Sequence, residues 1–308
     1  MYEKKVLLRE IIIKFNNLYP LNKSYMKKSS VITVALFALS LSCCVQKQNH
    51  GSTTGKLFII GGGNRTDTMM KDLIDISGVR AGGYIYILPM ASSTPDSAII
   101  WAKEDFSVTG IKKVYGYNFR AGETPPKAQL DSLRKARLIY ISGGDQSRFM
   151  SVVLNTPIME AVHEAYNHGS VIAGTSAGAA VMSKKMITGN QKKHTDPDAG
   201  FVTIESDNVE VTQGLGFLTD VIIDQHFIKR QRLNRLISVS IENPDELCVA
   251  MDESTAIIVD GDYATVSGIS QVIVIKNTNK IKYIKNGLLG TEGLQLSVYL
   301  PGQKFRLR

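Results

Sequence analysis

The chain has 308 residues, a length that allows one large domain or two small ones. Its formal net charge of +8 is uneven, because residues 1–43 hold seven Lys and Arg side chains against Glu3 and Glu10. The rest of the chain is close to balanced, with both signs interspersed, which argues against an extended basic surface of the kind that binds nucleic acid. We therefore expect no nucleic-acid partner.

Residues 26–44 have the features of an export signal. Met26-Lys27-Lys28 gives a basic head, an apolar run follows from Val31, and Leu41-Ser42-Cys43-Cys44 closes the segment. The apolar run is too short for a good membrane span. The ending resembles a bacterial lipoprotein signal, with Cys44, or alternatively Cys43, as the lipidated residue. A plain signal peptide with incidental cysteines is the other interpretation.

This pattern suggests four parts: an upstream stretch with the lipoprotein signal (1–44), a polar tether (45–55), an α/β domain (56–276) and a C-terminal β appendage (277–308). We take Met26 as the true start. The mature protein is then expected to be an exported bacterial lipoprotein, held by its N-terminal lipid in the periplasm or at the cell surface.

Apolar runs and helical spacings alternate from residue 56 to residue 173. The predicted strands are 56–60, 84–88, 113–117, 138–141 and 171–173, and the predicted helices are 66–76, 94–108, a short one ending at 133, and 158–167. Repeated strand–helix alternation is typical of an α/β fold with a mostly parallel, doubly wound sheet and helices on both faces.

The second half of the chain is less regular. It holds a predicted helix over 230–241 and predicted strands at 221–223, 247–251, 256–259, 264–266 and 272–275. We expect residues 183–220 to form strands and loops outside the main sheet, as small antiparallel additions, and the tail to be a polar hairpin. Cys248 lies in an apolar run, so we expect it to pack in the core.

Ser176 lies in the pattern Gly174-Thr175-Ser176-Ala177-Gly178, between an apolar strand and a helix. Gly-x-Ser-x-Gly in this setting is a nucleophile elbow, a tight turn that exposes the serine hydroxyl above the carboxyl end of the strand. The alternative is an ordinary turn rich in glycine and alanine.

Ligands of open α/β sheets collect beyond the carboxyl ends of the strands. The segments there are 61–64 and 143–146, besides the elbow itself. The backbone N–H groups of Gly143, Gly144 and Ala177 are candidates for an oxyanion hole. Glycines that only make turns are the alternative. We expect no metal site and no cofactor.

A nucleophilic serine needs a base. Of the five histidines, only His226 directly follows a buried strand; the others are predicted in the tether, on a helix or in a loop (His50, His163, His168 and His194). His226 is therefore the candidate base. No histidine comes after it, which argues against an α/β-hydrolase fold.

Three segments together resemble the cyanophycinases: Gly174-Thr175-Ser176-Ala177-Gly178-Ala179, Asp224-Gln225-His226-Phe227 with Arg230, Arg232 and Arg235, and Asp252-Glu253-x-Thr255-Ala256. Cyanophycinases are serine exopeptidases of the dipeptidase E-like family, built on a class I glutamine-amidotransferase-like sheet. The resemblance runs from about Lys56 to Ile275, and its combined motifs are very specific.

The resemblance implies that Ser176 is the nucleophile and His226 the general base. It implies a substrate pocket formed by Gln146, Asp224, Gln225, Arg230, Arg232 and Arg235. Two residues stay open as the acid that orients the histidine: Glu205, between serine and histidine in the chain, and Glu253, at the end of a strand.

Cyanophycin is an aspartate backbone that carries an arginine on each β-carboxyl group. Arg232 and Arg235 are three residues apart, so a helix over 230–241 would put both on one face, where they could bind carboxylates. Arg230 is expected to bind a terminal carboxylate, and Asp224 a substrate guanidinium. A solvated arginine face is the alternative.

The leading expectation is therefore a lipid-anchored serine exopeptidase that releases β-aspartyl-arginine dipeptides through an acyl-enzyme. An aspartyl dipeptidase acting on short peptides is the second hypothesis for the function. A non-catalytic lipoprotein that binds peptides is the third. The oligomeric state stays open, with a homodimer as one option.

Overall fold

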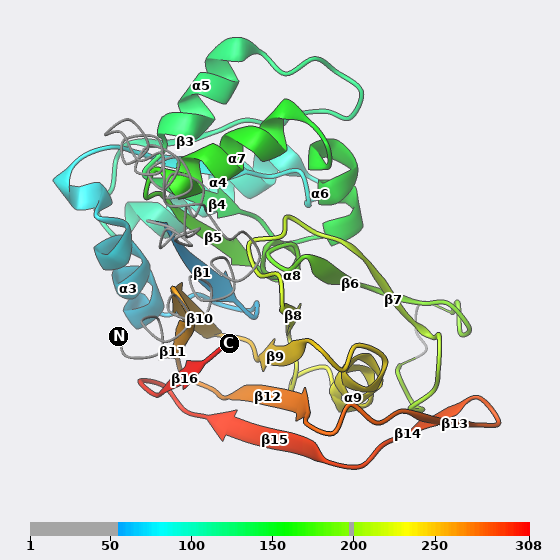
Figure 1. The fold of residues 1–308 in the computed structure, drawn as a ribbon. Coiled ribbons are helices and arrows are strands. Elements are labelled where there is room, and N and C mark those ends of the chain that lie inside the picture. The colour runs from blue at the N-terminus through cyan, green and yellow to red at the C-terminus, as the bar shows by residue number, and fades with distance from the viewer. Residues whose placement is uncertain (1–54, 197–199) are drawn as a thin grey trace, which may run out of the picture. The chain divides into compact units, whose positions relative to one another are not determined.

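The computed structural model describes residues 55–196 and 200–308, all within one unit, Ser52–Arg308, that is organised by two sheets (Figure 1). The predicted signal segment, Cys43 and Cys44, and the tether up to residue 54 lie outside the described residues. None of the helices in the described ranges combines the length and the hydropathy of a membrane-spanning segment.

The main sheet has eight strands in the order β16-β11-β10-β1-β5-β4-β2-β3. The five strands from β1 to β3 in this order are parallel, and β10, β11 and β16 extend the sheet in antiparallel fashion. This confirms the predicted α/β class and its mostly parallel sheet. The strands are β1 (Lys56–Ile60), β2 (Ile85–Leu88), β3 (Val114–Gly116), β4 (Leu138–Ile141), β5 (Val171–Thr175), β10 (Thr255–Asp260), β11 (Tyr263–Gly268) and β16 (Lys304–Arg306).

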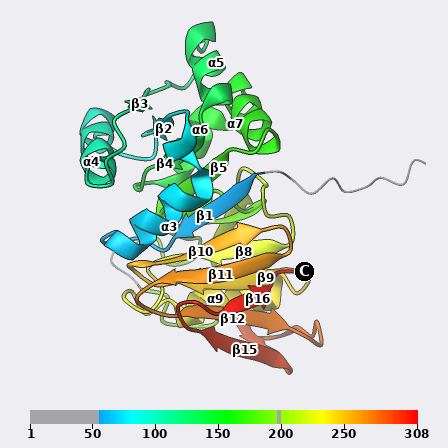
Figure 2. The ribbon, with the colours of Figure 1, turned by 90° about the vertical axis from the view of Figure 1, so that its left-hand side faces the viewer.

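Helices cover both faces of the parallel part (Figures 1 and 2). Successive strand residues point to opposite faces, so Phe58 and Ile60 pack with α3 and α4, whereas Leu57 and Ile59 pack with α5, α6 and α7. The helices are α3 (Asp67–Ser77), α4 (Pro95–Ser107), α5 (Lys127–Lys135), α6 (Gln146–Val153), α7 (Pro157–Asn167), α8 (Ala177–Ala180) and α9 (Leu233–Glu242), with a 3₁₀ turn at Val79–Ala81.

Helix α6 was not predicted. It starts because Asp145 caps it: the Asp145 carboxylate accepts hydrogen bonds from the backbone N–H groups of Ser147 and Arg148 at 2.7 and 3.1 Å. The cap places Gln146 at the first position of the helix, directly after β4 and its loop.

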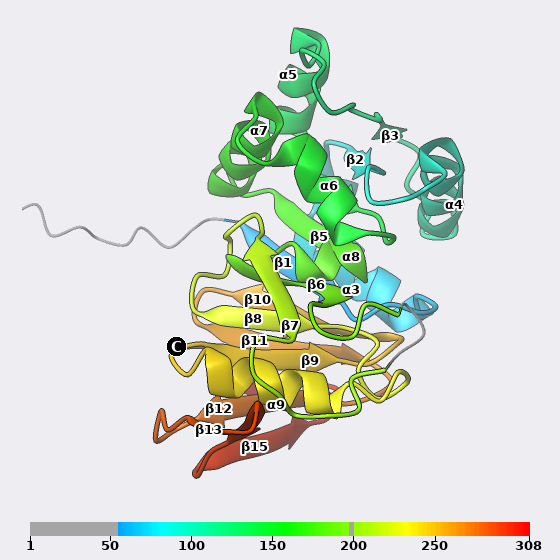
Figure 3. The same cartoon turned by 90° about the vertical axis from the view of Figure 1, so that its right-hand side faces the viewer.

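The second sheet has the order β15-β12-β9-β8, and only its β8–β9 pair is parallel. One face packs on the main sheet through Val249, Met251 and their neighbours, and the other face packs on α9 through Cys248 and Ala250 (Figure 3). Cys248 is fully buried and free, as predicted. The strands are β8 (Val221–Asp224), β9 (Leu247–Met251), β12 (Val272–Asn277) and β15 (Leu294–Tyr299).

Two antiparallel pairs lie outside these sheets, and the C-terminal tail is more than a hairpin. The pairs are β6 (Lys185–Gln191) with β7 (Val209–Gln213), and β13 (Tyr283–Lys285) with β14 (Leu288–Gly290). The tail was expected to form an appendage, but β15 joins the second sheet and β16 pairs with β11 in the main sheet. Without the tail, the outer edges of β12 and β11 would have unpaired backbone groups, and β15 and β16 pair with them.

Candidate active site

Ser176 sits at the turn between β5 and α8 in a strained backbone conformation, with φ 54° and ψ −109°. A Cβ on Gly174 would stand 2.1 Å from the carbonyl oxygen of Gly178, and a Cβ on Gly178 would stand 2.4 Å from that of Ile141. Only glycine fits at either position. The turn therefore has the close packing of a nucleophile elbow, with the serine at its apex.

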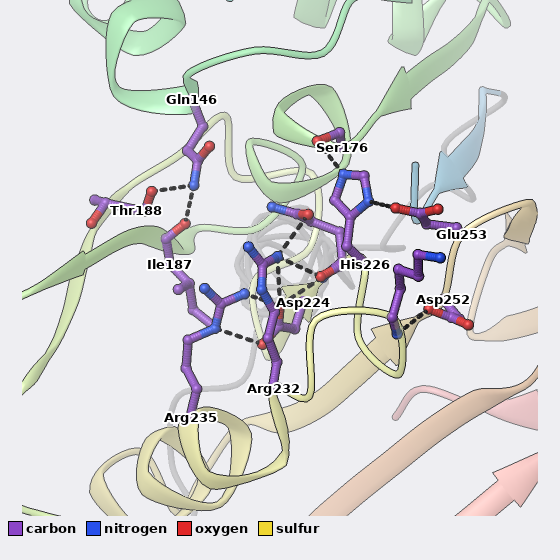
Figure 4. Close-up of polar contacts among 12 residues, drawn as sticks. Gln146, Ser176, Ile187, Thr188, Asp224, His226, Arg232, Arg235, Asp252 and Glu253 are labelled. Carbon is purple, nitrogen blue, oxygen red and sulfur yellow. Dashed lines mark hydrogen bonds and ion pairs between the residues drawn. The ribbon is translucent and has the colours of Figure 1, made fainter. Parts of the chain in front are cut away.

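A hydrogen-bonded relay joins three side chains (Figure 4). The Oγ of Ser176 lies 2.8 Å from Nε2 of His226, and Nδ1 of His226 lies 2.7 Å from Oε1 of Glu253. In a neutral imidazole, Nδ1–H donates to the carboxylate and Nε2 accepts from the serine hydroxyl. This is the geometry of a nucleophile, a base and an acid that orients the base.

The relay is assembled across the two sheets. Ser176 follows β5 of the main sheet, whereas His226 follows β8 and Glu253 follows β9 of the second sheet. The backbone N–H of His226 donates to the carbonyl of Gly61, at the end of β1, over 2.8 Å. The buried strand before His226 is thus not a strand of the main sheet, because β8 pairs with β9 in the second sheet.

The pKa of His226 is lowered from its ordinary value. Burial is the largest cause, since it penalises the imidazolium. The charges of Arg230 and Arg232 lower the pKa further, while the hydrogen bond to Glu253 and its charge oppose the shift. The imidazole is therefore neutral near pH 7 and able to accept a proton.

The structure separates the two candidate acids. Glu205 accepts hydrogen bonds from Thr203 at 2.7 Å and Asn208 at 3.2 Å, and pairs with His194 at 2.5 Å. It makes no contact with His226, so its prediction as the orienting acid was wrong, and the carboxylate that reaches the imidazole is that of Glu253.

Gly61, Gly62 and Gly63 belong to the site, although a glycine run at the end of a strand was weak evidence for it. A Cβ on Gly62 would stand 2.2 Å from Cε1 of His226, and one on Gly63 would stand 2.7 Å from Cβ of Glu253. The glycine run leaves room for the base and the acid. Its position directly after the first strand was the available signal.

Of the predicted oxyanion donors, Gly143 and Ala177 lie beside the serine, and Gly144 packs against Ala91. A Cβ on Gly143 would stand 3.4 Å from that of Ser176, and a Cβ on Gly144 would stand 2.1 Å from the carbonyl of Ala91. The backbone N–H groups of Gly143 and Ala177 donate to no acceptor among the described residues. Their role as oxyanion donors stays a prediction that this placement permits.

Asp224 and Arg235 form a buried ion pair. The two oxygens of Asp224 accept from Nε of Arg235 at 3.0 Å and from its Nη2, and both side chains are almost fully buried. Arg235 also lies 5.3 Å from the centroid of the Phe201 ring. Since each charge is already paired inside the protein, the prediction that these two residues bind substrate does not fit their placement.

Arg230 and Arg232 are placed differently from Arg235. Helix α9 begins only at Leu233, so the prediction that Arg232 and Arg235 share a helix face was wrong. The Nη1 of Arg232 donates to the backbone carbonyl of Gln225 at 2.6 Å and to its side-chain carbonyl at 2.9 Å. Burial and the neighbouring Arg235 charge lower the pKa of Arg232 to about 10. Arg230 is exposed.

Gln146 supports the neighbouring β-ribbon. Its side-chain nitrogen donates to the carbonyl of Ile187 at 2.9 Å and to that of Thr188 (Figure 4). The amide donors are thus engaged within the protein. If Gln146 contacts substrate as predicted, its side-chain carbonyl oxygen is the atom that remains for this contact.

A cavity of about 260 Å³ opens beside Ser176 and His226. Its wall also holds Arg65, Trp101 and Asp105, which sequence reasoning did not single out. No sequence pattern connects Arg65 with Asp105. The only sequence signal for either residue was the position of Arg65 just after the glycine run. The described residues contain no group of three or more His, Cys, Asp or Glu side chains that could hold a metal ion.

A serine–histidine–glutamate relay at a nucleophile elbow, on a mostly parallel sheet of this kind, defines a serine-type peptidase with a class I glutamine-amidotransferase-like fold. The chain belongs to peptidase family S51, whose model matches residues 57–267.

Known proteins similar to this chain include a cyanophycinase from Nostoc sp., 34% identical over 241 residues that cover 74% of this chain and 78% of the relative. A peptidase E from Actinobacillus pleuropneumoniae is more distant, 28% identical over 155 residues, 48% of this chain and 61% of the relative. The crystal structure of a peptidase from an acI-B1 Actinobacterium has the same fold, with a TM-score of 0.60 at 19% identity, over 82% of this chain and 96% of that one.

Proposed function

We propose that this protein hydrolyses cyanophycin and releases β-aspartyl-arginine dipeptides. The observation that carries the proposal is the relay of Ser176, His226 and Glu253, at 2.8 and 2.7 Å, in a chain that is 34% identical to a cyanophycinase. A non-catalytic peptide-binding protein would have no use for a strained serine aligned with a neutral buried base.

The proposed mechanism is acyl transfer. The Ser176 hydroxyl attacks the scissile carbonyl while His226 takes its proton, and the resulting oxyanion accepts hydrogen bonds from Ala177 and Gly143. The imidazolium then gives that proton to the leaving amine as the C–N bond breaks, and the polymer stays esterified to the serine. Water, deprotonated by His226, hydrolyses the ester and restores the serine.

The roles of the arginines in this proposal follow from their exposure. Arg230 is exposed and Arg232 is partly exposed, and both charges act on His226, so both lie near the catalytic base. These two guanidinium groups are suited to carboxylates of the departing dipeptide. The Asp224–Arg235 pair instead fixes the segment that carries the base.

An aspartyl dipeptidase is the second candidate, favoured by the similarity to a peptidase E. It would use the same relay on short peptides with an N-terminal aspartate.

Incubation with cyanophycin, and separately with Asp-Xaa dipeptides, distinguishes the two candidates. Release of β-aspartyl-arginine by the wild type but not by Ser176→Ala, followed by mass spectrometry, is the expected result. Cleavage of the dipeptides alone would favour the second candidate. Equal cleavage by Ser176→Ala would remove the serine mechanism from both.

We also propose that the protein is exported and lipidated on Cys44, with Cys43 as the alternative, from the basic head, apolar run and cysteines of residues 26–44. Mass spectrometry of the membrane fraction is expected to find an acylated N-terminal cysteine. A soluble, unmodified N-terminus beginning downstream would contradict the anchor without affecting the enzymatic proposal.

A further inference from the structure

The cavity beside Ser176 has a charged wall that the mechanism above does not use. Besides Ser176 and His226, Arg65, Asp105 and Trp101 line it, and none of the arginines that follow His226 does so. Arg65 comes from the segment between β1 and α3, and Asp105 and Trp101 come from α4. This wall therefore belongs to the main sheet and its helices, not to the second sheet.

Arg65 is held in place but has free donors. Its Nη2 is paired with Oδ2 of Asp105, and its Nη1 reaches the carbonyl of Gly63 only at the limiting distance of 3.5 Å. Its Nε is enclosed and has no partner among the described residues. A guanidinium group offers five N–H donors in a rigid fork. Three quarters of the Arg65 side chain is buried, and the residue lines the cavity, so the terminal N–H groups that Asp105 and Gly63 do not use are the donors it can offer to a ligand there.

The N–H donors of Arg65 in the cavity wall are suited to binding a carboxylate. A fixed, partly desolvated guanidinium binds carboxylates in a bidentate manner, and Asp105 holds Arg65 without occupying both terminal nitrogens. The exposed indole of Trp101 adds a flat surface to the cavity wall. Typical small-molecule pockets have 300–1,000 Å³, so a cavity of about 260 Å³ is suited to one side chain.

We propose that this cavity is the subsite for the residue that supplies the scissile carbonyl, and that Arg65 binds a carboxylate on that residue. The inference rests on the proposed peptidase function. In cyanophycin the carboxylate is the α-carboxylate of the arginine attached to that aspartate. In an aspartyl dipeptide it is the β-carboxylate of the N-terminal aspartate. Asp105 is a positioning residue that orients the guanidinium.

The first experiment uses two synthetic cyanophycin oligomers. One is unmodified, and in the other the arginine α-carboxylate is a carboxamide on the unit that supplies the scissile carbonyl. We expect wild-type kcat/KM to fall about tenfold or more on the carboxamide, the usual scale for a lost charge-assisted contact. In Arg65→Ala, kcat/KM should fall by a similar factor on the unmodified oligomer and should change little on the carboxamide oligomer. Arg65→Lys should keep part of the preference.

Arg134 provides the matched control. It is a partly buried arginine paired with Glu164 and Asp131 on the surface of α5 and α7, outside the cavity. Arg134→Ala should leave both oligomers unaffected. A loss of equal size on both oligomers in Arg65→Ala would make Arg65 part of the scaffold and overturn the inference. A preference that appears only when the carboxamide is on the departing unit would overturn it too.

A second experiment does not depend on cyanophycin hydrolysis. Aspartyl and asparaginyl diphenyl phosphonates place phosphorus where the carbonyl carbon would lie. Ser176 Oγ forms the new P–O bond as the bond to one phenoxide breaks, and the serine proton passes through His226 to that phenoxide, which leaves as phenol. We expect the wild type to be labelled about tenfold faster by the aspartyl compound, and Arg65→Ala to lose this preference. Labelling without a preference in the wild type, together with an unchanged kcat/KM on the carboxamide oligomer, would overturn the subsite. Failure on cyanophycin with the preference intact would overturn only the cyanophycin proposal.

Discussion

Gly62 lies directly against the imidazole of His226: a Cβ at this position would stand 2.2 Å from Cε1 and 2.5 Å from Nε2. No rearrangement of a flexible side-chain end can relieve such a contact, because the imidazole is fixed by Ser176 on one side and Glu253 on the other. The backbone at Gly62 therefore limits where the base can lie.

We predict that Gly62→Ala lowers kcat about 100-fold or more, since displacement of a catalytic group by about 1 Å costs on that scale. Steady-state kinetics on the hydrolysed substrate checks this. The matched control is Gly122→Ala, where φ is 76° and a Cβ would meet nothing within 4 Å. That variant also places alanine at a positive φ, so equal kinetic losses in the two variants would contradict the steric explanation.

The choice between the two candidate acids can be tested directly. Glu253→Gln is expected to lower kcat by about 10²–10⁴, because the amide no longer fixes the imidazole in the tautomer that accepts from Ser176. Glu205→Gln should stay within about twofold of wild type, since a residue outside the relay makes no transition-state contact. A large loss in Glu205→Gln, or none in Glu253→Gln, would mean that a different carboxylate orients His226.

The Asp224–Arg235 pair predicts a loss of stability. Asp224→Asn leaves the buried Arg235 guanidinium without its counter-charge, which is expected to lower the free energy of unfolding by about 3–5 kcal/mol. Urea denaturation followed by circular dichroism measures it. Asp131→Asn, which breaks the exposed pair with Lys127, should leave the unfolding free energy near that of wild type. If Asp224→Asn were as stable as that control, the pair would be free to serve substrate binding.

The lowered pKa of His226 predicts the pH dependence of hydrolysis. The base must be neutral, so kcat/KM falls as pH drops through the pKa of His226 in the free enzyme, and the acid limb should lie below the ordinary histidine pKa of 6.5. Arg230→Ala removes a positive charge that disfavours the imidazolium, and should therefore move the limb to higher pH. A limb that stays in place in Arg230→Ala would show that this charge does not act on His226.

Local patterns predicted the parts of the fold and site that depend on neighbours in the chain. The elbow at Ser176 and the parallel strands before it follow from short apolar runs and glycines. The start of α9 was misplaced because Gln231 adopts φ 52°, a left-handed turn that periodicity does not reveal. The arginines before and after that turn consequently occupy different environments.

Contacts between residues far apart in the chain could not be predicted from the sequence. Glu205 and Glu253 both carry plausible carboxylates, and only the pairing of β8 with β9 brings one of them to the imidazole. Arg65 and Asp105 are forty residues apart and meet only because α4 packs beside the strand-end loop after β1. Neither contact has a fixed spacing in the sequence that could have predicted it.

The division of the relay between two sheets makes activity sensitive to how those sheets are held together. Ser176 moves with β5, and His226 and Glu253 move with β8 and β9, so a slip of one layer against the other separates nucleophile and base while each sheet keeps its own hydrogen bonds. The tail reaches both layers through β15 and β16. The last fifteen residues of the chain thus help to hold the two sheets in register, and so keep Ser176 aligned with His226, although these residues are not part of the active site.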